Sequence, residues 1–227
     1  MSNKRNNGTL GHEEEIDQNI ELYFFSPNKE KDDFIEQYKK VKVDRYTREK
    51  GYRYSPLFII QKDIRYCLGA RKQFNDIPKD KRDPANFAGV ILIYTAFYNL
   101  VKKFYSGNYP GFAKKFMSIE HDDQKILKYL RHGLIHNNYS LSYYKNDHKY
   151  YFILGAGLDE LIEKLEAKRS YPSSTYLIDV RKLMRIFEQG IQSFKEYLLD
   201  RNHSKARKLF TQNFDVDTWI YIKESKP

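Results

Sequence analysis

Cysteine is almost absent from this chain of 227 residues, which contains a single one, Cys67. One thiol excludes a disulfide within the chain and a zinc site assembled from several cysteines of one chain. Such cysteine usage is typical of a reducing compartment, so we predict a cytoplasmic location. Cys67 lies in an apolar stretch of helical spacing, and we expect it to be a small buried side chain.

Long apolar runs are lacking as well. No stretch of about eighteen consecutive apolar residues occurs, and the N-terminal sequence MSNKRNNGTLG lacks the apolar segment of a signal peptide. We therefore expect neither secretion nor contact with a membrane. Residues 1–11 are polar and rich in asparagine and glycine, which predicts a disordered tail, and residues 12–227 are predicted to form one domain.

Acidic residues are too few to balance the basic ones. The 40 Lys and Arg residues exceed the 30 Asp and Glu residues and leave a formal net charge of +10. An excess of cations favours polyanionic partners, because phosphates release counterions when cations neutralise them. The same charge would also serve solubility alone. Charge therefore leaves two alternatives open: a nucleic-acid partner, or a protein that binds no anionic partner.

Apolar residues recur at helical spacing over most of the chain, which predicts a mainly α fold. The segment 84–105 is apolar on most of its faces and is expected to be the central core helix. Residues 43–55 are charged and rich in tyrosine, and we expect a loop there. The predicted helices cover residues 12–25, 29–42, 56–68, 84–105, 121–137, 158–169 and 174–199, followed by a helix and a short strand within 204–227.

Residues 139–154 carry a different pattern. Aromatic and β-branched residues flank the turn sequence KND, as YSLSYYK before it and HKYYFIL after it. This arrangement predicts a β-hairpin inserted into the helical domain. The tyrosines of the hairpin are equally compatible with packing on the helices and with stacking on unpaired bases.

The segment 125–140, KILKYLRHGLIHNNYS, places ionisable side chains on one side of a predicted helix. At about 100° per residue, the arc expected to face the core contains Ile126, Leu127, Leu130 and Leu134. The opposite side contains the ionisable residues Lys125, Lys128, His132 and His136, with Arg131 at its margin. Ile135 shares this outward face, where an isolated monomer has little use for an isoleucine.

Three interpretations of this face are open. The first is an ordinary solvated helix surface. The second is a zinc site, since His132 and His136 stand four residues apart, although the glutamate of zinc-protease helices is missing between them. The third is metal-free RNA cleavage, which needs a base at the 2′-OH, an acid at the departing 5′-oxygen and a cation on the phosphorane. Histidine serves as base or acid, and arginine as the cation.

The sequence Arg131-His132-Gly133-Leu134-Ile135-His136 resembles the R-x4-6-H motif of HEPN-domain ribonucleases, in which Asn, Asp or His commonly follows the arginine. The resemblance implies a HEPN-like helical bundle and a homodimer whose two motifs meet in a composite active site. It also implies metal-independent cleavage of RNA, with tRNA or mRNA as typical targets, a 2′,3′-cyclic phosphate product and no cofactor. Many members are toxins or anti-phage abortive-infection effectors, so an antitoxin or a sensor is a further candidate partner.

The resemblance also assigns roles to individual residues. His136 matches the catalytic histidine and Arg131 the phosphate-binding arginine, while His132 matches the polar position that supports orientation or substrate. Lys128, Asn137 and Tyr139 are candidate substrate-binding residues, although Asn137 also suits a helix cap. Some members carry a tyrosine two residues beyond the histidine that an antitoxin modifies. In this chain Tyr139 stands three residues beyond His136, which departs from that pattern.

Two alternatives to an enzyme are kept. A HEPN-like fold can serve as a non-catalytic module that binds RNA or another protein through the same face. A helical scaffold in a larger assembly is the other, and it is favoured if Arg131 and His136 are buried and engaged within one monomer.

Overall fold

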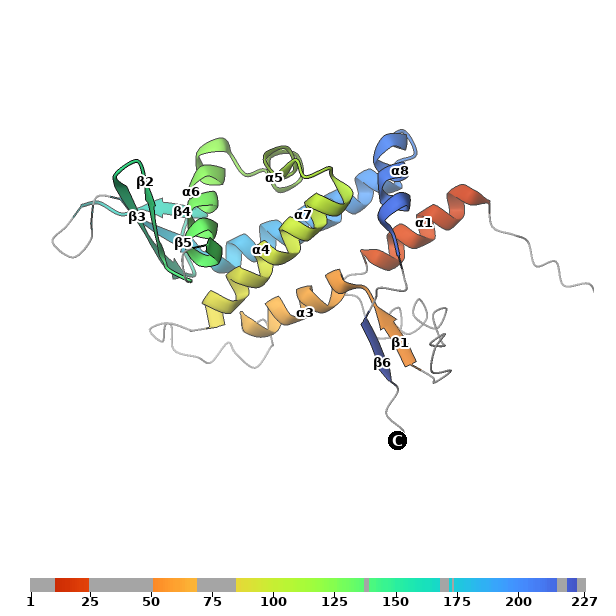
Figure 1. The fold of residues 1–227 in the computed structure, drawn as a ribbon, viewed down its shortest axis with the longest axis horizontal. Helices are drawn as coiled ribbons and strands as arrows, with labels where there is room; N and C mark the ends of the chain where they lie inside the picture. Colours follow the sequence, from red (N-terminus) through yellow and green to blue (C-terminus); the bar gives the residue numbers. More distant parts are fainter. Residues whose placement is uncertain are drawn as a thin grey trace, which may run out of the picture.

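The computed structural model describes residues 11–24, 51–68, 85–136, 139–167, 172, 174–215 and 220–223 (Figure 1). This part of the chain is mainly α-helical, as predicted. Its helices are α1 (His12–Tyr23), α3 (Pro56–Cys67), α4 (Ala85–Phe104), α5 (Tyr109–Met117), α6 (His121–Arg131), α7 (Val180–Leu199) and α8 (Ser204–Asn213). The predicted helix at 29–42 and almost all of the predicted N-terminal tail lie outside the described residues.

The two longest helices, α4 and α7, pack against each other and carry the core of the molecule (Figure 1). Helix α3 packs on α4, α5 packs on α7, and α1 and α8 cover the far end of the pair. Segment 84–105 is thus confirmed as a core helix. Ser55 explains where α3 begins, because its side chain accepts a hydrogen bond from the Phe58 amide and Pro56 occupies the first turn.

Phenylalanine fills the space between these helices. The fully buried rings belong to Phe24, Phe104, Phe112, Phe187, Phe194 and Phe210. The rings of Phe112 and Phe194 meet edge to face with centroids 5.1 Å apart, a favoured aromatic geometry. Each such side chain stabilises the fold by about 1.5–3 kcal/mol relative to an exposed one. The aromatic core holds α5 on α7 and thereby positions the start of α6.

The predicted hairpin is confirmed as β2 (Ser142–Lys145) and β3 (His148–Gly155). Asn146 and Asp147 both have positive φ, 49° and 58°, as a tight two-residue hairpin turn requires. The hairpin is more than an insertion, because it forms one side of a four-stranded sheet with the order β2-β3-β5-β4. Strand β5 (Thr175–Asp179) runs parallel to β3, and β4 (Ile162–Lys164) runs antiparallel to β5.

This sheet corrects two predictions. The segment 158–169 contains strand β4 in place of a helix, and the predicted helix at 174–199 begins only at Val180, after strand β5. Both errors arise because strand pairing over a long sequence separation overrides a local helical pattern. Asp179 ends β5 and caps α7, since its buried carboxylate accepts a hydrogen bond of 2.8 Å from the Lys182 amide.

A second, two-stranded sheet joins distant parts of the chain. Strand β1 (Gly51–Tyr54) pairs antiparallel with β6 (Ile220–Lys223). The expectation of a loop at 43–55 is therefore wrong for its last residues, because their partner strand lies near the other end of the sequence. The C-terminal helix and short strand are confirmed as α8 and β6. Cys67 is half-buried rather than buried, because it lies at the last turn of α3.

One helix of the described residues, α4, is long and apolar enough over Phe87–Phe104 to span a membrane by length and composition. Within the fold 44% of this window is buried against other helices. A core helix of a globular protein has the same properties. The expected absence of membrane contact stays a prediction.

Candidate functional site

The Arg131–His136 motif lies where α6 ends. The α-helix stops at Arg131, and residues His132–His136 form a π-helical turn in place of the predicted continuous α-helix. Leu127, Leu130 and Leu134 of the predicted core-facing arc are buried as expected, whereas Ile126 is only half-buried at its edge. Local π-helical geometry is rare and is often found at functional sites.

Gly133 allows the chain to fold back tightly after this turn. The Ser140 amide donates a hydrogen bond of 3.0 Å to the Gly133 carbonyl. A Cβ atom on Gly133 would lie 2.6 Å from the Ser140 carbonyl oxygen and 2.7 Å from that of Ser142. A larger residue would therefore push the start of β2 away from the motif.

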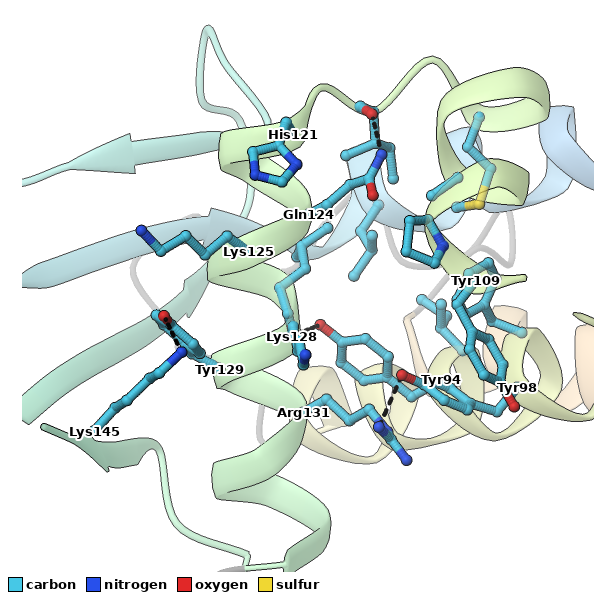
Figure 2. A pocket seen from close by; sticks show the side chains of 18 residues that line it. Tyr94, Tyr98, Tyr109, His121, Gln124, Lys125, Lys128, Tyr129, Arg131 and Lys145 are labelled. Atoms are coloured by element: carbon cyan, nitrogen blue, oxygen red, sulfur yellow. Dashed lines mark hydrogen bonds between the residues drawn. The ribbon is translucent and has the colours of Figure 1, made fainter. Parts of the chain in front are cut away.

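Arg131 is half-buried and turned toward α4 (Figure 2). Its Nη1 donates a hydrogen bond of 2.8 Å to the Tyr98 hydroxyl, and its guanidinium carbon lies 3.5 Å from the centre of the Tyr98 ring. Its Nε is buried and has no hydrogen-bond partner among the described residues. The guanidinium is thus held in place by one aromatic residue while part of its donor capacity is unused.

His132 and His136 lie side by side, with ring centroids 5.3 Å apart. The ring of His132 also stacks on Tyr143 of β2, at 5.4 Å and an interplanar angle of 22°. Partial burial lowers the pKa of His132 below its usual 6.5, and the positive charges of Arg131 and of His136, when protonated, lower it further. His132 is therefore uncharged at neutral pH and able to accept a proton.

His136 and its neighbour Ile135 face solvent. Ile135 is 41% exposed, which agrees with its expected place on the outward face. No described contact joins Arg131 to His136 within one protomer: the arginine faces α4, whereas His136 is exposed next to His132. The condition set for a scaffold, that both residues be buried and engaged, is not met: Arg131 is engaged by Tyr98 but only half-buried, and His136 is exposed.

The other predicted site residues are spread around this centre. Lys128 is exposed on α6, and Tyr139 is 67% exposed with its ring centroid 6.4 Å from that of Phe87. Asn137 lies outside the described residues. Among the described residues no group of three or more His, Cys, Asp or Glu side chains could hold a metal ion. Within the described part of the chain, the zinc interpretation therefore has only the two histidines of the motif to build on.

The contacts that two residues make in the site did not follow from the sequence. Tyr98 lies on the predicted core helix 84–105, and its ring and hydroxyl hold Arg131 from a position 33 residues away. Tyr143 is one of the hairpin tyrosines that suited either packing on the helices or stacking on bases, and it stacks on His132. No local pattern marks either residue, because both contacts depend on how the hairpin and α4 pack around α6.

A cavity of about 310 Å³ opens beside Arg131, between α4, α5 and α6 (Figure 2). Aromatic rings of Tyr94, Tyr98 and Tyr109 line the side opposite α6. Helix α6 contributes a polar and basic edge, which consists of His121, Gln124, Lys125, Lys128 and Arg131. Aspartate and glutamate are absent from the described residues that line the cavity, whereas Lys125, Lys128, Arg131 and Lys145 are among them.

The chain was compared with known proteins at three levels. No protein-family model, no curated protein and no solved structure matches it.

Proposed function

We propose that this protein is a metal-independent endoribonuclease of the HEPN type, which cleaves RNA at a composite site between two copies of the chain. The observation that carries the proposal is the arrangement at the end of α6. There an exposed His136 and a His132 of lowered pKa stand side by side, and Arg131, which precedes His132 in the chain, is held on Tyr98. These are the group types that metal-free RNA cleavage requires, in one basic surface region.

The proposed reaction assigns one task to each group. A histidine takes the proton of a 2′-OH, whose oxygen then attacks the adjacent phosphorus. Arg131 stabilises the charge that grows on the phosphorane oxygens, because its guanidinium presents several fixed donors. A protonated histidine gives its proton to the departing 5′-oxygen. The products are a 2′,3′-cyclic phosphate and a 5′-hydroxyl, and no metal or cofactor takes part.

A second copy of the chain supplies what one protomer lacks. Arg131 and His136 of one protomer make no described contact with each other, so a two-fold arrangement would bring an arginine and a histidine from each copy to one phosphate. The exposed Ile135 beside His136 gives this face an apolar contact for such a dimer. A role as a toxin or abortive-infection effector acting on tRNA or mRNA, with an antitoxin or sensor as partner, belongs to the same proposal.

His136→Ala tests the proposal on total cellular RNA. We expect cleavage to fall by roughly 10²–10⁴-fold, because a general acid or base is removed. His12→Ala on α1, another exposed histidine, is the matched control and should cleave like wild type. Wild-type cleavage should persist in EDTA and should leave cyclic-phosphate ends. Equal cleavage by His136→Ala and wild type would end the catalytic proposal.

The non-catalytic alternative is favoured by one observation, the engagement of Arg131 by Tyr98. An arginine already stacked and hydrogen-bonded can serve as a fixed contact for a phosphate without turnover. This module would retard RNA in a gel without generating new ends, and the His136→Ala variant would retard it equally.

A further inference from the structure

The cavity beside Arg131 combines two surfaces that suit different parts of one ligand. Its α4 and α5 walls are aromatic, with the ring centroids of Tyr98 and Tyr109 4.1 Å apart and the rings tilted by 31°. Its α6 edge carries lysines and Arg131 without an acidic residue among the described lining. Aromatic walls favour a planar ring, and a cationic edge favours an anion. A nucleotide has both parts joined by a sugar.

Polar groups on the α6 edge, across from the aromatic wall, add selectivity for such a ligand. Gln124 donates through Nε2 to the Ile119 carbonyl at 2.7 Å, which orients its amide and leaves the amide oxygen with no hydrogen-bond partner among the described residues. The guanidinium of Arg131 lies on the same edge, and within the described part of the chain only its Nη1 is engaged, by Tyr98. An oriented acceptor can hydrogen-bond to a base, and a guanidinium can hydrogen-bond to a phosphate.

We infer that this cavity binds one unpaired nucleobase of the RNA strand, with the adjoining phosphate at Lys128 and Arg131. The inference rests on the proposed function for the identity of the polymer, and it adds the form of substrate. Because the base must leave its stack to enter a cavity beneath α6, the pocket selects single-stranded or looped RNA over a duplex. It also anchors the strand beside the phosphate that Arg131 would hold for cleavage.

The test measures binding without cleavage. His136→Ala is the background, and the probes are a labelled single-stranded oligoadenylate and a strand of equal length made of base-free sugar phosphate. We expect the base-bearing strand to bind about tenfold more tightly than the base-free strand, since base stacking on aromatic residues is sequence-tolerant and substantial. A duplex of the same length should bind like the base-free strand.

Two substitutions place the effect in the cavity. Ala113→Leu adds methyl groups to a buried wall residue, and Tyr109→Leu removes an aromatic ring. Either should abolish the difference between the two strands while affinity for the base-free strand changes little. Tyr66→Leu, at an exposed tyrosine of α3, is the matched control and should keep the difference. Thermal unfolding of each variant checks that it is folded. Ala113→Leu reduces the volume of the cavity and Tyr109→Leu increases it, so the two tests are independent.

The outcomes separate this inference from the ribonuclease proposal. If both Ala113→Leu and Tyr109→Leu still bind the base-bearing strand more tightly than the base-free strand, the inference of a base-binding pocket is wrong, even if the wild type cleaves RNA. If both substitutions abolish the difference in affinity between the two strands, the pocket is supported, even if the wild type leaves RNA intact. AMP and ribose 5-phosphate, measured by calorimetry, distinguish the source of the nucleotide: AMP binding as tightly as the oligoadenylate would assign the cavity to a free nucleotide and overturn the RNA assignment.

Discussion

Arg131 and His132 are adjacent in the sequence, yet their surroundings have opposite effects on a positive charge. The Tyr98 ring and hydroxyl stabilise the cation of Arg131, whereas partial burial and neighbouring cations disfavour a cation on His132. The lowered pKa favours the uncharged form of His132 at neutral pH, directly beside an arginine. This separation suits a site in which a fixed cation and a proton acceptor act on one phosphate.

The shifted pKa of His132 predicts a pH dependence of stability. In the unfolded chain His132 takes up a proton near its ordinary pKa of 6.5, whereas in the folded protein it does so only at lower pH. Between these two values the unfolded state binds more protons, so the free energy of unfolding decreases as the pH falls through 6.5. The groups facing His132 are Arg131, His136 and Lys128 beside it in the chain, and Tyr143 and Lys145 from β2.

His132→Gln should remove this component of the pH dependence. The measurement is urea unfolding of both proteins at several values between about pH 5 and pH 8 and constant ionic strength. His12→Gln on α1 should retain the wild-type slope. An unchanged slope in His132→Gln would show that the folded and unfolded states protonate this residue alike.

Tyr98→Phe tests how Arg131 is held. The substitution keeps the ring under the guanidinium and removes the hydroxyl that accepts from Nη1. We expect kcat/KM for RNA cleavage to fall about tenfold, since one partly solvated hydrogen bond to a charged group is lost. Tyr105→Phe, just beyond α4, is the control with near wild-type activity. Unaltered cleavage by Tyr98→Phe would mean that this hydrogen bond does not position Arg131 for the reaction.

At the scale of elements, the junction between α6 and β2 determines the site. The π-helical turn and the close approach at Gly133 bring Tyr143 of β2 onto His132. Strand β2 is in turn held by β3, which pairs with β5 in the sheet. The sheet therefore positions one histidine, while α4 positions the arginine.

Gly133→Ala should destabilise this junction. Its new methyl group would meet two backbone carbonyl oxygens that cannot move without shifting β2, so we expect a loss of about 1–3 kcal/mol in the free energy of unfolding. Gly11→Ala is the comparison, because no atom lies within 4 Å of a Cβ there. Its cost should stay below about 1 kcal/mol. Equal losses in both variants, measured by urea unfolding, would contradict the structural role of Gly133.

At the scale of the whole molecule, the proposed ribonuclease site needs more than one protomer. Arg131 faces the cavity and α4, whereas His136 and Ile135 face outward. A partner copy on the outward face would bury Ile135 and pair the two motifs. The proposed chemistry therefore depends on the oligomeric state of the protein.

Ile135→Lys should convert a dimer into monomers, because it places a cation in an apolar contact near its symmetry mate. We expect the dissociation constant of the dimer to rise by roughly tenfold or more, and cleavage to be lost in parallel. Sedimentation velocity over a concentration series measures this, with Tyr66→Lys on α3 as the control. A wild type that cleaves RNA while entirely monomeric would refute the composite site.

Local patterns in the sequence were sufficient for several features. Helical periodicity located α3, α4 and the core-facing leucines of α6, because burial on one side of a helix leaves a repeat that needs no partner to be recognised. The Asn146–Asp147 turn located the hairpin, since few residues tolerate positive φ. The outward place of Ile135 and His136 followed from the same helical geometry.

Tertiary structure alone decided the rest. Strands β1, β4 and β5 exist because of partners distant in the sequence, and local periodicity therefore predicted a loop or helices there. The stacking of Arg131 on Tyr98, the lowered pKa of His132 and the cavity beneath α6 likewise depend on which helices and strands meet. Periodicity reports which side of a segment is buried, whereas only packing determines what that side, or its edge, will touch.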